Sequence, residues 1–236
     1  MIERITLAGL AFGCHVYNTL GGDVDGGYTS FVRQANAKPD LTNKQQCIWL
    51  LEWLNRWGCR QFKKADYDLA ANEISAWYTA FGGSLVPKDK DILSLTDAEF
   101  GNVERVYNGL VSRTASVKET RGRRMNVRFG PVGTAKILFA LRPNALIPWD
   151  NPIFNYFSLD GSAHSYTVYL RKAKKWLNEL GEDCKKNGFE LAELPRKVGR
   201  PGSPLAKLID EYLWVTVAKR WKAPSIAVLE QWVSWS

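Results

Sequence analysis

Apolar residues recur at steps of three and four over most of the chain, which is the spacing of one face of an α-helix. The clearest case is the segment 41–57, where Ile48, Leu51 and Leu54 are interleaved with tryptophans at positions 49, 53 and 57. The same pattern predicts further helices over residues 3–20, 65–81, 96–110, 134–141, 162–180, 205–213 and 225–235. No segment shows the two-residue alternation typical of a strand. The pattern therefore predicts an all-α protein with about eight to ten helices.

Residues that begin and end helices support these boundaries. Thr96 and Glu99 have the spacing of a capping box, in which each side chain bonds a backbone amide at the helix start. Ser162 is predicted to cap the long helix that follows it, and Ser203-Pro204 to open a later helix as its N-cap and first residue. Glycines at 58, at 82–83 and within the break 181–188 are predicted to end the helices before them.

The segment 23–37 is rich in Gly, Asp and Asn and is predicted to be a loop. Asp23 and Asp25 lie close to glycines there, so a calcium loop is the alternative to a solvated turn. The segment lacks the regular oxygen ligands and the closing Glu of an EF-hand. The solvated turn is therefore preferred.

The composition allows a sizeable hydrophobic core. The chain has 236 residues, of which 45% are hydrophobic and 24% charged, typical of a folded protein. Two organisations stay open: a single helical domain over 1–236, or a second lobe formed by the N- and C-terminal helices around a central 40–160 region. The ten tryptophans are interpreted as core residues because of their helical spacing, with a base-stacking surface as the alternative.

The charge points towards a polyanion. The formal net charge is +8 and the pI about 9.3, which favours nucleic acid first and an acidic membrane surface second. The segment 112–128 is polar and is predicted to be a basic loop that would suit a phosphate backbone; a solvated charge run is the alternative. Its basic residues are Lys118, Arg121, Arg123, Arg124 and Arg128.

Several classes of protein are disfavoured. The four cysteines have no C-x-x-C spacing and the two histidines lie far apart, so no metal site or cofactor is expected and reduced thiols in a cytoplasmic protein fit best. No apolar run approaches the roughly 18 residues of a membrane span. The N-terminal stretch is interpreted as an amphipathic helix and not a signal peptide, because its charged start has no net positive charge. The oligomeric state is left open.

The segment 128–157 contains the residues that most suggest a functional site: a Gly-Pro-Val-Gly sequence and a Pro-Trp-Asp-Asn-Pro sequence on either side of an apolar stretch. Gly130-Pro131-Val132-Gly133 is predicted to be a tight turn that leads into a short apolar helix. Such a turn would expose backbone amides, which bind anions together with the helix dipole. The alternative is a plain turn in which the glycines supply the backbone angles.

Asp150 follows at the start of the next helix, in the sequence Pro148-Trp149-Asp150-Asn151-Pro152. One interpretation is that Asp150 or Asn151 caps the helix and Pro152 fits its first turn. The other is a carboxylate that faces a cleft, where it would stabilise a cation or activate water.

Residues 129–135 (FGPVGTA), the apolar helix and Pro148-Trp149-Asp150 together resemble the helix-hairpin-helix DNA glycosylase superfamily. The resemblance implies an all-α protein that wraps DNA, with hairpin amides of Gly130, Val132, Gly133 and Thr134 on a phosphate and Asp150 as the catalytic carboxylate. The hairpin is one residue shorter than the family's, with Gly and Pro reversed. The position of the family's lysine nucleophile is Gly133, so only a monofunctional enzyme is implied.

Three functions follow as hypotheses. The first is a monofunctional N-glycosylase, with Asp150 catalytic, Trp149 in a pocket for a flipped base, and phosphates held by the hairpin amides and by Arg121, Arg123, Arg124 and Arg128. The second is a non-catalytic nucleic-acid-binding protein with the same basic segment. The third is a protein–protein interaction module, whose basic charge would be spread evenly over the surface.

Overall fold

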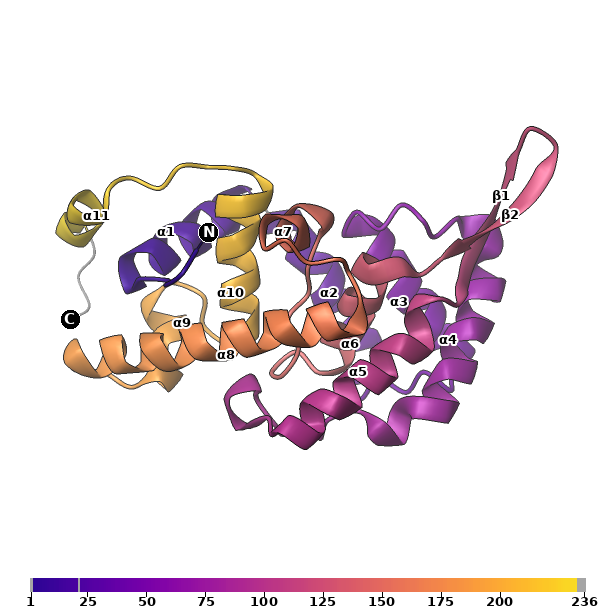
Figure 1. The fold of residues 1–236 in the computed structure, drawn as a ribbon, viewed down its shortest axis with the longest axis horizontal. Coiled ribbons are helices and arrows are strands. Elements are labelled where there is room, and N and C mark those ends of the chain that lie inside the picture. The colour runs from indigo at the N-terminus through magenta and orange to yellow at the C-terminus, as the bar shows by residue number, and fades with distance from the viewer. Residues whose placement is uncertain (1, 21, 233–236) are drawn as a thin grey trace. The chain divides into compact units, whose positions relative to one another are not determined.

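The computed structural model describes residues 2–20 and 22–232. Over this part the chain forms eleven α-helices, short 3-10 and π-helical segments, and one two-stranded sheet (Figure 1). The mostly helical prediction is confirmed, and the prediction of no strands is wrong. None of the helices described is both long and apolar enough to cross a membrane.

The chain forms two compact units. The central unit consists of residues 23–87 and 96–142, and the terminal unit of residues 1–22, 88–95 and 143–236. Each unit is assembled from segments far apart in the sequence, and each has its own buried core.

The central unit holds five helices and the sheet. Its helices are α2 (Gly22–Gln34), α3 (Lys44–Arg56), α4 (Tyr67–Phe81), α5 (Asp97–Val111) and α6 (Gly130–Leu141). Its strands are β1 (Thr114–Thr120) and β2 (Arg123–Arg128), and its 3-10 segments are η1 (Lys64–Asp66) and η2 (Gly82–Ser84).

Local capping explains where two of these helices begin. The Asn43 side chain accepts from the amides of Gln45 and Gln46 at the start of α3. The capping box of Thr96 and Glu99 is formed at the start of α5, as predicted. Because the first amides of a helix have no partner within it, these side chains fix the helix starts.

The core of the central unit is aromatic. Trp53 and Trp77 are buried, and the Trp77 indole donates to the Val106 carbonyl at 3.0 Å. Helix α6 is buried at every position from Gly133 to Leu141, which explains why its sequence is apolar on all sides. The interpretation of the tryptophans as core residues is confirmed for Trp53 and Trp77.

Helix α2 replaces the loop predicted over residues 23–37. The chain is helical from Gly22 to Gln34 and then turns through Asn36 and Ala37, which have positive φ angles. The side chains of Asp23 and Asp25 lie outside the described part of the structure. The loop prediction followed intrinsic propensity; here tertiary packing outweighs it, because Phe31 of this helix is buried and stacks on Trp53.

The terminal unit contains the remaining helices. These are α1 (Leu7–Leu20), α7 (Asn151–Tyr156), α8 (Ala163–Lys186), α9 (Leu194–Lys197), α10 (Leu205–Leu213) and α11 (Ile226–Trp232). Shorter segments are the 3-10 turns η3 (Ile92–Ser94) and η4 (Leu191–Glu193), and the π-helical η5 (Trp214–Ala218).

Helix α8 is the longest of these, and Ser162 caps it as predicted. The predicted break over 181–188 is wrong, because the helix continues through Gly181 to Lys186. Gly181 is buried, and a Cβ at this position would make an ordinary contact with Leu191 at 3.5 Å. The glycine therefore does not end the helix.

Candidate nucleic-acid interface

The sheet forms a two-stranded ribbon, residues 114–128, that extends away from the helices of the central unit (Figure 1). This replaces the basic loop predicted over 112–128. The ribbon carries five of the chain's basic residues and one acidic residue, Glu119. Every residue from Lys118 to Asn126 is exposed.

The turn of the ribbon has two residues, Arg121 and Gly122. Thr120 pairs with Arg123 on either side of it, and both turn residues have positive φ angles, +53° and +74°. Two positive φ angles are what a type I′ hairpin turn requires. Gly122 adopts this conformation without strain, whereas Arg121 does so at a cost of about 1–2 kcal/mol.

The register distributes the basic side chains over both faces. Lys118 pairs with Met125, and Glu119 pairs with Arg124. Paired residues lie on the same face, and successive residues of a strand alternate between faces, so the side chains fall into two sets, one for each face. One face carries Lys118, Thr120, Arg123 and Met125; the other carries Glu119, Arg124, Asn126 and Arg128. Polyanion-binding groups are therefore available on both faces.

The ribbon keeps a net positive charge: Glu119 lies opposite Arg124, and the other basic residues have no acidic residue opposite them. None of the five forms an ion pair or a side-chain hydrogen bond with another described residue. The positive charge of the ribbon is thus exposed to solvent and available to a partner.

Hydrogen bonds fix the base of the ribbon to the rest of the central unit. The Ser116 hydroxyl donates to the Gln61 carbonyl at 2.7 Å, and the Val117 amide donates to Asp66 Oδ2 at 3.0 Å. Lys63 Nζ donates to the Val117 carbonyl at 2.8 Å. These three bonds hold the ribbon at its base while its outer half stays exposed.

Gln61 also connects the ribbon to helix α6. Its side-chain nitrogen donates to the Phe129 carbonyl at 3.0 Å, directly before the helix begins. A Cβ at Gly133 would lie 2.6 Å from this nitrogen and 3.2 Å from Phe62 Cζ. Gly133 is therefore required for the close approach of Gln61 and Phe62.

The predicted turn at residues 130–133 is the first turn of helix α6, which begins at Gly130. The prediction of a separate tight turn is wrong; only Gly130 has a positive φ, +65°. The element before it is strand β2, not a helix. Pro131 and Val132 are half-buried, and the Tyr107 hydroxyl donates to the Pro131 carbonyl at 3.4 Å.

Thr134, expected to contact phosphate, lies inside the core. Its side chain is fully buried, and its hydroxyl has no hydrogen-bond partner within the described structure. A phosphate outside the unit does not reach this position without displacing its neighbours. The arginines of the ribbon are thus exposed to solvent, whereas Thr134 in α6 is buried.

Asp150 and Trp149 belong to the terminal unit, while the residues expected to bind phosphate belong to the central unit. Asp150 is the N-cap residue of α7, with extended backbone angles. Its carbonyl accepts from the amides of Ile153 and Phe154. Its half-buried carboxylate makes no hydrogen bond to the amides of α7, so capping does not account for the side chain.

Trp149 is fully buried in an aromatic cluster. Its ring centroid lies 5.0 Å from that of Tyr166, 5.3 Å from Phe154 and 5.5 Å from Tyr169. The hydroxyls of Tyr166 and Tyr169 donate to the carbonyls of Ile147 and Pro148. Since stacking on a base requires an accessible ring face, this position does not offer a base pocket in the present conformation.

Tyr169 is buried, and Asp150 is the smallest of the groups that act on it electrostatically. Burial raises the pKa of Tyr169 well above its ordinary value, and the negative charge of Asp210 adds to this, followed by Tyr166 and Asp150. The tyrosine is therefore held neutral.

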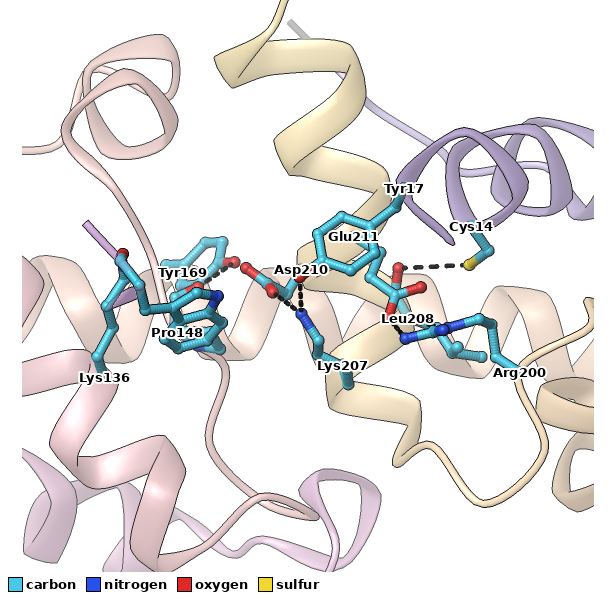
Figure 2. Close-up of polar contacts among 11 residues, drawn as sticks. Cys14, Tyr17, Lys136, Pro148, Tyr169, Arg200, Lys207, Leu208, Asp210 and Glu211 are labelled. Atoms are coloured by element: carbon cyan, nitrogen blue, oxygen red, sulfur yellow. Dashed lines mark hydrogen bonds and ion pairs between the residues drawn. The ribbon is translucent and has the colours of Figure 1, made fainter. Parts of the chain in front are cut away.

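The terminal unit contains a buried group of charged residues that the local sequence patterns do not single out (Figure 2). Glu211 of α10 is fully buried, and its Oε1 accepts two bonds from Arg200, at 2.7 and 3.1 Å. Arg200 also donates to Asn18 Oδ1 at 2.7 Å. Burial, with the nearby charge of Glu211 and a hydrogen bond to it, raises the pKa of the Cys14 thiol well above its ordinary value.

A second buried ion pair, between Lys207 and Asp210, lies on α10 beside Glu211. Lys207 Nζ contacts Asp210 Oδ2 at 2.8 Å and donates to the Tyr17 hydroxyl at 3.0 Å (Figure 2). The ammonium also lies 4.2 Å from the centroid of the Tyr17 ring. The spacing of Lys207 and Asp210 by three residues beside an apolar stripe is the signal that would have suggested this pair.

Arg200 lies in the segment 195–204, which starts within α9 and continues into a loop. Its ion pair with a buried carboxylate gives this arginine a structural role within the terminal unit. The buried charges are close-packed and mutually compensating, so they are best explained as part of the core.

Comparison of the chain with protein families, with curated proteins and with solved structures gave no match. The assignment of a function therefore rests on the residues of this chain and their arrangement.

Proposed function

We propose that this protein binds nucleic acid through the β1–β2 ribbon. The observation that supports this is the exposed net positive charge of residues 118–128, carried by an element whose base is fixed to the unit. Lysine and arginine on such an element neutralise phosphates and release counterions, which drives association with a nucleic acid.

Ion pairs distinguish three lysines of α8 from the basic residues of the ribbon. On α8, Lys175 lies 3.7 Å from Glu179, Lys185 lies 3.3 Å from Glu182, and Lys186 lies 3.6 Å from Asp183. These lysines are exposed and paired with acids. None of the five basic residues of the ribbon forms such a pair with a described residue, so α8 offers a surface of paired lysines against which the ribbon can be compared.

The proposal is tested by nucleic-acid binding at several salt concentrations. The variant Arg121→Ala/Arg123→Ala/Arg124→Ala removes three ribbon charges. If each arginine binds a phosphate, we expect the slope of log K against log salt to become shallower by about 0.9 for each phosphate that is no longer neutralised. Fluorescence anisotropy with a labelled mixed-sequence duplex measures both the affinity and the slope.

A matched control removes the same charge from another surface. The variant Lys175→Ala/Lys185→Ala/Lys186→Ala removes three exposed, ion-paired lysines of α8. We expect it to keep most of the affinity and the slope of the wild type. Equal losses in both variants, or no binding by the wild type at low salt, would contradict the proposal.

We also propose a second, catalytic function, monofunctional release of a base from DNA with Asp150 as the carboxylate that stabilises the developing sugar cation. The observation that favours it is the half-buried position of the Asp150 side chain at the start of α7. The buried position of Trp149 means that another surface would have to receive the base.

The catalytic proposal is tested with Asp150→Asn on duplexes that contain deaminated or alkylated bases. Base release is measured by alkaline cleavage of abasic sites, and binding by anisotropy. We expect the variant to bind as the wild type does and to lose base release. Undiminished release by the variant, or no release by the wild type from any of the duplexes, would remove Asp150 from this role.

A further inference from the structure

The geometry points to one substrate class: we infer that the tip of the ribbon, residues 120–123, enters the major groove of B-form duplex DNA. This inference rests on the proposed function and specifies its target. It is supported by the width and reach of the ribbon, by the chemistry of its outer half, and by the conformation of Arg121.

The ribbon has the dimensions of the groove. Paired strands lie about 4.8 Å apart, and the B-DNA major groove, about 12 Å wide and 8.5 Å deep, admits a two-stranded ribbon with its side chains. From the pair Val117 and Asn126 to the pair Thr120 and Arg123 the strands rise three residues, about 10 Å. The exposed half is therefore long enough for its tip to reach the floor of the groove.

The order of residues along the ribbon suits such an insertion. Arg121 and Arg123, at and beside the turn, carry guanidinium groups that can bond guanine O6 and N7, and Thr120 adds a hydroxyl. Arg124 lies one residue and Lys118 two residues further back along the strands, about 3 Å and 7 Å closer to the rim of the groove, where the phosphates are. Met125, half-exposed at 50%, offers an apolar contact on the same face as Arg123.

Arg121 occupies a backbone position that favours Gly, Asn or Asp. Its φ of +53° strains a long side chain, and the strain brings no contact within the described structure. A guanidinium at the outermost point of the ribbon is explained if it meets a partner there.

Other nucleic acids fit this element less well. The major groove of A-form RNA is deep and narrow and does not admit side chains for readout, and a single strand has no groove. Binding to the phosphate backbone alone would not distinguish these forms beyond their charge. The inference therefore predicts a preference for duplex DNA over duplex RNA of the same sequence.

The test compares the full chain on three probes of one sequence: duplex DNA, duplex RNA and single-stranded DNA, at one salt concentration. We expect duplex DNA to bind at least about tenfold more tightly than duplex RNA. Dimethyl sulfate interference then separates the grooves, because it methylates guanine N7 in the major groove and adenine N3 in the minor groove. We expect methylation of guanine N7 to weaken binding and methylation of adenine N3 to leave it unchanged.

Two single variants locate the contact. Arg121→Asn removes the guanidinium at the tip and keeps a residue suited to positive φ, so the turn stays folded. Arg128→Ala removes the same charge at the base of the ribbon. We expect Arg121→Asn to weaken the guanine N7 interference and to reduce the preference for duplex DNA, while Arg128→Ala lowers the affinity for each probe but preserves both.

The outcomes distinguish the two proposals. Equal affinity for duplex DNA and duplex RNA, or no effect of guanine N7 methylation, would overturn groove insertion while nucleic-acid binding still holds. Interference only at adenine N3 would place the ribbon in the minor groove and likewise overturn the inference. If the wild type binds none of the probes at low salt, the proposed function itself fails.

Discussion

At the scale of single residues, burial distinguishes polar side chains with a structural role from those that can bind a ligand. The sequence predicts that Thr134 holds phosphate, yet this residue is buried with an unsatisfied hydroxyl within the described structure. A buried hydroxyl without a partner costs free energy that an isosteric methyl group avoids.

Thr134→Val therefore tests the role of the hydroxyl, because valine keeps the backbone amide. We expect the free energy of unfolding to stay the same or to rise by up to about 1 kcal/mol, with no change in nucleic-acid binding. Urea denaturation and anisotropy measure the two quantities. Weakened binding in a variant of unchanged stability would return Thr134 to the phosphate site.

Arg200 neutralises the buried carboxylate of Glu211. Its removal would leave Glu211 buried without this counterion, so we expect Arg200→Ala to destabilise the protein by about 3 kcal/mol. Arg196→Ala is the control, because Arg196 forms an exposed pair with Glu193 and its loss should cost less than about 0.5 kcal/mol. Similar denaturation midpoints for the two variants would show that the buried pair contributes little.

At the scale of secondary-structure elements, close helix packing depends on glycine. A Cβ at Gly13 of α1 would lie 2.9 Å from the Cα of Tyr212 in α10. Because the obstacle is backbone, the two helices would have to separate.

We expect Gly13→Ala to destabilise the protein by about 1–3 kcal/mol. Gly101→Ala in α5 is the matched control: a Cβ there meets nothing within 4 Å, and alanine has the higher helix propensity, so stability should rise by up to about 1 kcal/mol. Thermal unfolding of both variants checks the signs. An increase in Tm for Gly13→Ala would show that the helices accommodate the methyl group.

The elements that the sequence predicted correctly carry local signals. The capping box at Thr96 and the cap at Ser162 lie within one turn of the helices they begin, so no distant contact is needed to place them. The ribbon has no such signal: it is exposed on both faces over residues 118–126, so its strands lack the alternation of apolar and polar residues by which strands are identified.

At the scale of the whole molecule, the outer part of the ribbon, residues 118–125, is separable from both cores. Residues 118–125 contribute no buried side chain, while Val117 and Asn126 already form a pair. Replacing 118–125 by Asn-Gly would close a shorter hairpin with a favourable two-residue turn.

We expect this shortened protein to keep the Tm of the wild type and to lose nucleic-acid binding, because four basic residues are removed and both cores stay intact. Thermal unfolding and anisotropy on the same preparation check this. Retained affinity in the shortened protein would place the nucleic-acid surface elsewhere on the molecule.

The sequence by itself determined the helical character of the chain, several helix starts and the exposed basic segment, because each follows from residues within a few positions of one another. Only the tertiary structure decided that the basic segment is a ribbon and that Gly133 serves packing. It alone placed Thr134 and Trp149 in cores and joined Arg200 to Glu211. These outcomes depend on partners distant in the sequence or on burial against another element, and the local pattern of one chain contains neither.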